Sequence, residues 1–274
     1  MDTKECNVTN NITISNSNVS IGSCCGESNL PDCDKDYSNS PYNHKNYYDS
    51  LGQIHNLLLE ECRIYTLEKI EKNPPEKIDL MWCVDVSTYI LRQNHYELKE
   101  NAFYEIAKHI IEDANNWFEN YINKVELLSE NKKILIELIQ NLKKLSDEEI
   151  VYYYKYKETI LKYEEIFLNK FSLKDKELIV LLSAMSILRH SLFYWFYNIN
   201  EEEETKAKKG VWRKVVMGLC DAAGAIGGGI AGAVAGTAVL PGAGTALGAS
   251  AGAVTGAITA SNGAATLWDN YVKK

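Results

Sequence analysis

Residues 222–267 read AAGAIGGGIAGAVAGTAVLPGAGTALGASAGAVTGAITASNGAATL, a stretch without one charged side chain. Glycine recurs in it at every fourth position, in two series on either side of Pro241-Gly242. The series are Gly224, Gly228, Gly232 and Gly236, then Gly244, Gly248, Gly252 and Gly256. Because a step of four residues returns to the same face of an α-helix, each series predicts a helix with one flat glycine face. Pro241-Gly242 predicts the turn that reverses the chain between the two helices.

Glycines inside helices are unfavourable in water, since each costs about 1 kcal/mol relative to alanine. In a lipid bilayer, small residues let two helix backbones approach closely, and lipid offers the backbone no competing hydrogen bonds. Ile226, Ile230, Val234, Val254 and Ile258 are offset from the glycines and would face the lipid. The pattern therefore predicts a glycine-zipper helical hairpin that inserts into a membrane.

The length and the flanks of the hairpin agree with this prediction. Val215–Leu240 and Ala243–Thr266 are each long enough for a membrane helix, which needs roughly 20 residues. Aromatic and basic side chains, which favour the membrane interface, flank the hairpin and are expected to anchor both of its ends on one membrane face. They are Trp212, Arg213 and Lys214 before it, and Trp268, Tyr271, Lys273 and Lys274 after it.

Two alternatives to membrane insertion stay open. Alanine, glycine, serine and threonine outnumber leucine, isoleucine and valine in the hairpin, so a single arm is only weakly apolar. The same pattern also fits a water-soluble hairpin that packs against the rest of the chain, or a disordered tail. Asp221 lies near the start of the uncharged stretch and would have to stay at the membrane interface.

The preceding part of the chain has a different composition. Of the 17 glycines in 274 residues, none lies between Gly52 and Gly210. Apolar residues recur there at helical spacing and no alternation of period two persists, which predicts a bundle of about six helices. The predicted fold class is therefore all-α, with a disordered N-terminal arm over 1–46, a helical bundle over 47–200, a charged linker over 201–210 and the glycine-zipper hairpin over 211–274.

Two amphipathic patterns place individual helices in the bundle. The clearest is a run at steps of three and four, predicted to form one helix face: Phe103, Ala107, Ile110, Ala114, Trp117, Tyr121, Val125 and Leu128. A second helix is predicted from Ile134, Leu135, Leu138, Ile139 and Leu142.

Capping signals predict the starts of two further helices. Ser146 with Glu149 matches a capping box that would open a helix through Tyr153, Ile160 and Phe167. Ser172 with Asp175 is a weaker signal for a helix that reaches Tyr197. The apolar run in this last helix, 178–188, is shorter than a membrane span. We therefore expect this helix to be the central helix of the bundle. The alternative is a segment that enters a membrane when the bundle opens.

Charge and motifs argue against nucleic-acid binding and catalysis. From Lys206 onward, seven Lys or Arg oppose two Asp, so this region carries +5 of a net charge of -8 and residues 1–205 carry -13. An acidic body of this kind lacks the clustered cations that phosphate contact needs. No nucleophile elbow, phosphate-binding loop, dinucleotide fingerprint or paired Glu-x-x-His motif occurs, so we expect no enzyme, no cofactor and no catalytic residue. Arg189-His190 beside Trp195 is predicted to be a buried polar contact.

The cysteines and the N-terminus bear on location. Seven cysteines, with no Cys-x-x-Cys pair, predict reduced thiols and no metal site, although zinc at Cys24, Cys25 and Cys33 is a minor alternative. The residues before Cys24 have no basic start and no apolar core. We therefore expect synthesis in the cytoplasm without a standard signal peptide, followed by association with a membrane.

Residues 206–274 resemble bacterial glycine-zipper and bacteriocin-like peptides, whose Gly/Ala-rich hairpins insert into membranes and oligomerise into pores. They also look like the C-terminal segment of larger bacterial helical proteins, whereas the body resembles no family. The resemblance implies a membrane-active bacterial protein that inserts, oligomerises and permeabilises a bilayer, with an immunity or regulatory protein as a partner. The alternative is a non-toxic helical interaction or scaffold protein, anchored to a membrane by the hairpin or packed on it.

Overall fold

The structure is a computed structural model that describes residues 40–73, 75, 79–96, 116–148, 152–170, 175–197, 208–239 and 243–267. These residues form helices and connecting turns without a strand, which confirms the predicted all-α class. The helices are α1 (Ser50–Lys72), α2 (Leu80–Gln93), α4 (Trp117–Lys124), α5 (Ser129–Ser146), α6 (Tyr153–Lys170), α7 (Lys176–Tyr197), α8 (Lys208–Val239) and α9 (Ala243–Leu267).

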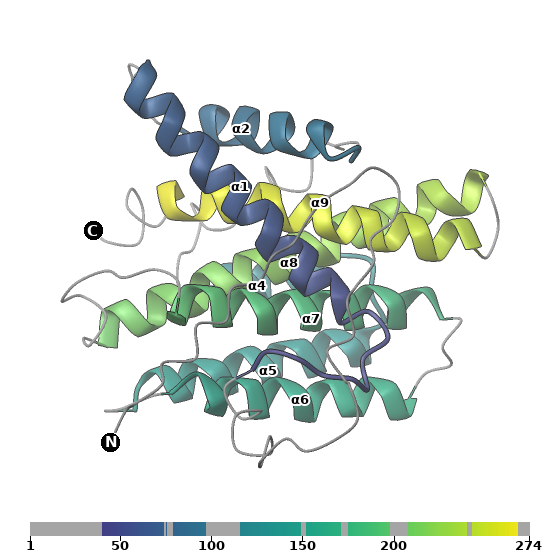
Figure 1. Cartoon of the computed structure of the whole chain (residues 1–274). Coiled ribbons are helices and arrows are strands. Elements are labelled where there is room, and N and C mark those ends of the chain that lie inside the picture. The colour runs from purple at the N-terminus through teal and green to yellow at the C-terminus, as the bar shows by residue number, and fades with distance from the viewer. Residues whose placement is uncertain are drawn as a thin grey trace, which may run out of the picture. The chain divides into compact units, whose positions relative to one another are not determined.

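Helix α7 lies at the centre of this arrangement (Figure 1). It packs against α6 on one side and against α8 on the other, while α1 and α9 also contact it. Sixteen of its residues are buried, because it is apolar almost all around. The expectation of a central core helix is confirmed.

Helices α8 and α9 form the predicted antiparallel pair, and they belong with the bundle to one compact unit, Tyr37–Lys274. Helix α8 begins at Lys208, so it includes the last three residues of the predicted linker. It runs antiparallel to α7, since Gly218 meets Leu192 and Gly229 meets Val180.

Among the described helices, two are long and apolar enough to cross a membrane: α7, and Gly210–Val239 of α8. The apolar window of α7 is 89% buried, as in the core helix of a globular bundle, whereas that of α8 is 44% buried. Helix α9 has the length, at 25 residues, but not the hydropathy. Exposure therefore separates α8 from α7 as a candidate for contact with lipid.

Two helix predictions are wrong at their boundaries. The apolar run from Phe103 to Leu128 does not lie on one helix, because α4 begins after Asn116 and ends at Lys124. Leu128 precedes α5 and is 56% exposed; residues 97–115 lie outside the described residues. Ser146 does not cap α6 either, since it is the last residue of α5, and its hydroxyl donates to the carbonyl of Leu142.

Other boundaries agree with the sequence. Helix α5 buries Leu135, Leu138, Ile139 and Leu142 as predicted. Helix α7 ends at Tyr197 as predicted, but it begins only at Lys176. Asp175 precedes it instead of lying in its first turn, and its carboxylate accepts a hydrogen bond from the backbone of Glu177. Ser172 and Glu149 lie outside the described residues. The arm prediction for 1–46 is wrong for its last part, because residues 40–46 pack on the bundle and Asn46 is buried.

A candidate membrane-binding hairpin and the polar cluster at its base

The glycines of α8 face the glycines of α9 along the whole hairpin. A Cβ atom at Gly228 would overlap the carbonyl oxygen of Gly252, and one at Gly232 would overlap that of Gly248. The same holds for the outer pairs, Gly224 with Gly256 and Gly236 with Gly244. The structure thus brings the eight predicted packing glycines together in four facing pairs, with backbone against backbone.

The hairpin has two halves with different surroundings. We call residues 211–229 and 253–264 the base, and residues 230–239 and 243–252 the tip. In the base, every residue from Val215 to Ile226 is buried, as is nearly all of the α9 part. This half packs against α7, α1 and α2. The tip follows the point where Gly229 meets Val180, near the beginning of α7, and extends past that helix.

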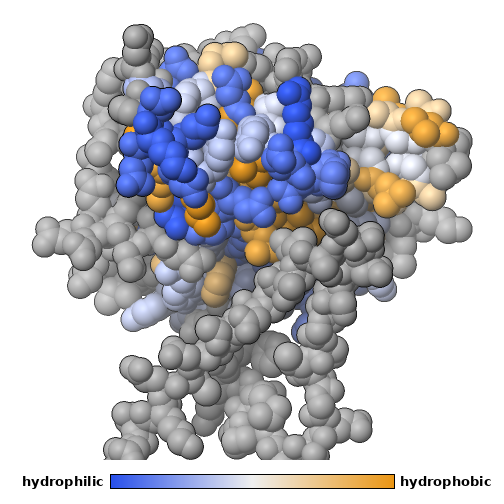
Figure 2. All heavy atoms as spheres, turned by 45° about the horizontal axis from the view of Figure 1, so that its top comes forward, coloured by the Kyte–Doolittle hydropathy of each residue, from blue (hydrophilic) through white to orange (hydrophobic). Residues whose placement is uncertain are grey.

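The tip exposes large apolar side chains. Val234 is 59% exposed, Val239 is 85% exposed and Leu247 is 71% exposed. No charged residue occurs anywhere in the tip. Figure 2 shows this end as a projecting region with apolar surface, at the right of the view. A hydrogen bond of 2.6 Å between the hydroxyls of Thr237 and Thr245 joins the two arms near the turn, and Pro241 and Gly242 lie outside the described residues.

The predicted anchors before the hairpin lie at the opposite end of α8 from the tip. Trp212, Arg213 and Lys214 are half-buried against the bundle. Lys143 Nζ lies 5.8 Å from the ring centroid of Trp212, and Lys214 Nζ lies 5.2 Å from that of Phe196. In this arrangement Trp212 contacts α5 and Lys214 contacts α7. The anchors after the hairpin, Trp268, Tyr271, Lys273 and Lys274, lie outside the described residues.

A buried polar cluster occurs where the base joins the bundle. Its members come from four helices: His55 of α1, Ser191 and Trp195 of α7, Asp221 of α8 and Ser261 of α9. We call these five residues the base cluster. The Ser191 hydroxyl donates to Asp221 Oδ2, and His55 Nε2 lies 3.7 Å from the same oxygen. His55 Nε2, Trp195 Nε1, Asp221 Oδ1 and Ser261 Oγ are buried without a hydrogen-bond partner among the described residues.

Burial dominates the protonation of this cluster. Loss of hydration raises the pKa of Asp221 to about 7, although Ser191, Ser261 and Trp195 act against the rise. Loss of hydration also lowers the pKa of His55 to about 4. Near neutral pH the histidine is therefore uncharged and the carboxyl is close to its own titration point. The place of Asp221 corrects the expectation that it stays at a membrane interface, because its side chain is fully buried in the bundle.

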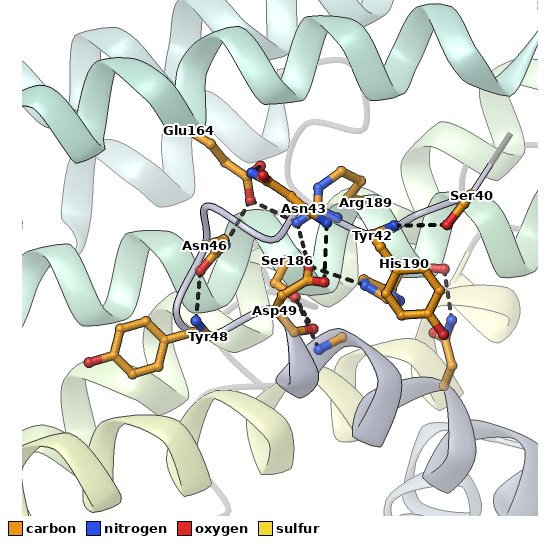
Figure 3. Close-up of polar contacts among 12 residues, drawn as sticks. Ser40, Tyr42, Asn43, Asn46, Tyr48, Asp49, Glu164, Ser186, Arg189 and His190 are labelled. Atoms are coloured by element: carbon orange, nitrogen blue, oxygen red, sulfur yellow. Dashed lines mark hydrogen bonds and ion pairs between the residues drawn. The ribbon is translucent and has the colours of Figure 1, made fainter. Parts of the chain in front are cut away.

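A second polar cluster holds the N-terminal segment on the bundle (Figure 3). The fully buried Arg189 binds Asp49 at 2.7 Å and Glu164 at 3.0 Å. Glu164 also accepts hydrogen bonds of 2.7 Å from the side-chain amides of Asn43 and Asn46. We call these residues, with His190, the Arg189 cluster.

His190 completes this cluster, with Nε2 at 3.3 Å from Asp49 Oδ1. Burial lowers the pKa of His190, and despite burial the hydrogen bond from His190 and the charge of Arg189 lower the pKa of Asp49. The prediction that Arg189-His190 is a buried polar contact is confirmed. The sequence did not reveal its partners, because Asp49 and Glu164 are distant from Arg189 in the chain and no motif connects them.

Metal ligation is not supported within the described residues, which contain no group of three or more His, Cys, Asp or Glu side chains able to hold an ion. Cys62, Cys83 and Cys220 are buried free thiols. The other four cysteines, including Cys24, Cys25 and Cys33, lie outside the described residues.

Comparison of the chain with protein-family models, with curated proteins and with solved structures gives no match. The functional argument therefore depends on the hairpin and on the two polar clusters.

Proposed function

We propose that the protein associates with lipid membranes by inserting the tip of the α8–α9 hairpin into one leaflet. The observation that carries this proposal is the combination of protrusion, apolar exposure and absence of charge in the tip. Val234, Val239 and Leu247 are each more than half exposed on helices that are otherwise closely paired. Apolar side chains exposed together on a projecting element favour burial in a lipid or protein partner.

The dimensions of the tip suit one leaflet. Ten residues of α8 follow Gly229, and at 1.5 Å per residue they extend about 15 Å. Half of the hydrocarbon core of a bilayer is also about 15 Å. Away from the turn, both arms satisfy their backbone hydrogen bonds internally as helices, which hydrocarbon requires; the groups at the helix ends beside the turn do not have partners within their own helix. The exposed side chains of the tip can enter lipid while Ala233 and Ala249 remain packed in the core.

A second candidate function is permeabilisation by self-associated hairpins, as the resemblance to bacteriocin-like peptides implies. The favouring observation is that glycine pairing continues through the tip, at Gly232 with Gly248 and Gly236 with Gly244. The two arms are thus held together by each other rather than by the bundle, so the hairpin keeps its own packing if its base leaves α7. Membrane anchoring without toxicity requires only the tip.

Flotation of the full-length protein with liposomes tests membrane association. Val234→Asp combined with Leu247→Asp places two charges on exposed positions, so folding is preserved while insertion of the tip becomes unfavourable. We expect at least a tenfold loss of liposome-bound protein relative to wild type. Leu57→Asp with Ile64→Asp, on exposed positions of α1, is the matched control and is expected to bind normally.

Equal binding by wild type and by the tip variant would contradict the proposal. Release of an encapsulated dye, measured on the same samples, separates the two candidate functions. Binding without release supports an anchor, and binding with release supports permeabilisation.

A further inference from the structure

The base cluster brings together side chains from both arms of the hairpin, from α1 and from α7. Asp221 has no cationic partner there, since the imidazole of His55 is neutral near pH 7 and stands 3.7 Å away. The Ser191 hydroxyl donates to Asp221 Oδ2, the neutral side chains of Ser261 and Trp195 also act on the carboxyl, and Asp221 Oδ1 is unpaired among the described residues. An ionised carboxylate in such a site is strongly unfavourable, whereas a protonated one is tolerated.

We propose that Asp221 regulates release of the hairpin: in its protonated form it permits the base to pack between α1 and α7, and in its ionised form it favours separation of the base from the bundle. The biological purpose of this release rests on the proposed membrane function. The pH-dependent separation of the base from the bundle is a property of the protein in the absence of lipid.

The groups around Asp221 set the direction of the effect. Helix α1 contributes His55, and the charge of His190 of α7 helps burial to lower the pKa of that histidine. Helix α8 contributes the neighbouring Cys220, and both burial and the charge of Asp221 raise the pKa of its thiol. Among the described residues that act on the Asp221 carboxyl, α7 and α9 offer only the neutral side chains of Ser191, Trp195 and Ser261. The neutral donors in this set offset the burial of a negative charge only in part, so a rise in pH weakens the packing of the base.

The released hairpin has a suitable place for the ionised carboxylate. Asp221 directly precedes the uncharged stretch that starts at Ala222 and continues through Leu267. In a hairpin freed from the bundle, Asp221 would lie in water beside the membrane, while the residues after it contact lipid. The same residue thus favours the packed hairpin when neutral and the released hairpin when charged.

The pH dependence has an expected size. Release exposes Asp221 and His55 together, and their pKa values move in opposite directions on burial. Between about pH 6 and about pH 8.5, Asp221 favours opening about tenfold and His55 opposes it about fourfold. The net opening constant of wild type is therefore expected to rise about threefold.

Hydrogen exchange of peptides covering residues 215–226, measured without lipid on the full-length protein, tests the proposal. After correction for intrinsic exchange rates, we expect the opening constant of wild type to rise about threefold and that of His55→Gln about tenfold. In Asp221→Asn the sign reverses, and the constant falls about fourfold, because only His55 still titrates. Asp85→Asn, at an exposed position of α2, is expected to behave as wild type.

The same pH dependence in Asp221→Asn as in wild type would overturn the proposal. If that variant did not fold, a His55→Gln protein without the tenfold rise would overturn it equally. The exchange measurement involves no lipid, so it stands whether or not the tip variant loses liposome binding. Failure of membrane association and failure of the pH-dependent release are therefore separate results.

Discussion

Gly228 of α8 and Gly252 of α9 approach so closely that any Cβ atom on one would overlap the backbone carbonyl of the other. This contact is one of four along the hairpin, and it determines how the arms fit together. Because the obstacle is backbone rather than the end of a flexible side chain, a substitution has no local escape. The arms must separate, or the substituted residue must leave the interface.

Gly252→Ala should therefore destabilise the protein, although alanine is the better helix former. The gain in helix propensity is about 1 kcal/mol, while forcing an extra methyl into a filled contact costs about 1–3 kcal/mol or more against backbone. We expect a net loss, measured as the free energy of unfolding in urea. Ala251→Leu adds a larger group at the exposed neighbouring position and should leave stability within about 0.5 kcal/mol of wild type. A Gly252→Ala protein as stable as wild type would show that the arms do not pack as described.

The hairpin was the most predictable part of the chain, because its signal is local. Eight glycines at a fixed step determine both the helices and the faces that meet, without reference to any other element. The division into a buried base and an exposed tip was not predictable in this way. It depends on where α7 begins opposite Gly229, and the glycine pattern is the same on both sides of that point.

Asn46→Ala should weaken the attachment of the N-terminal segment. The Asn46 amide donates to Glu164 at 2.7 Å and to the Leu182 carbonyl at 2.9 Å, and it is buried. Loss of both hydrogen bonds, one of them to a charged group, is expected to cost about 2–3 kcal/mol. Tyr47→Ala changes the next residue, which is 70% exposed, and should be nearly neutral. Limited proteolysis at residues 40–49 provides the measurement, and equal cleavage of the two variants would contradict this role.

Arg189→Leu should be among the most destabilising single substitutions in the bundle. It removes the cation that binds both Asp49 and Glu164 and leaves the buried Glu164 and the partly buried Asp49 without a cationic partner from Arg189. Breaking a buried pair in this way costs about 3–5 kcal/mol. Arg63→Leu breaks an exposed pair with Glu60 and is expected to cost less than about 1 kcal/mol. Thermal unfolding of both variants makes the comparison, and similar losses would show that the Arg189 cluster is not essential to the fold.

The two polar clusters explain why the site was only partly predictable. Ser40–Asn46 look like a continuation of a polar arm, and their order arises from Glu164 and Arg189 more than a hundred residues away. The capping-box prediction at Ser146 was wrong because tertiary contacts decide the role of this side chain. Its hydroxyl forms hydrogen bonds with the Leu142 carbonyl and the Tyr156 hydroxyl instead of capping a helix. Asp221 did carry a signal, as the last charged residue before the uncharged stretch, but only tertiary packing decides that it is buried.

Asp221→Asn should stabilise the folded protein, and increasingly so as the pH rises. Burial raises the pKa of Asp221 from 3.8 to about 7, so between these values the folded protein binds a proton that the unfolded chain has lost. The free energy of unfolding of wild type therefore falls as the pH rises through this range, and the loss is complete above about pH 7. A carboxamide still accepts the hydrogen bond of Ser191 but has no charge to bury. The advantage of the variant should approach about 4 kcal/mol above neutral pH and vanish below about pH 4.

His55 gives the free energy of unfolding the opposite pH dependence, so a His55 variant is the control for Asp221→Asn. Its pKa falls on burial from 6.5 to about 4, so the unfolded chain binds the extra proton and acid destabilises the fold between these values. In wild type the contributions of these two groups nearly cancel from about pH 4 to about pH 6.5, so the pH dependence of urea unfolding that remains there comes from other groups such as His190 and Asp49. In Asp221→Asn, of this pair only His55 titrates, so its contribution makes the free energy of unfolding rise with pH between about pH 4 and about pH 6.5. In His55→Gln only Asp221 titrates, so its contribution makes the free energy of unfolding fall over the same range. If both variants kept the pH profile of wild type, the base cluster would not titrate as its burial requires, since each substitution removes one of the two opposing protons.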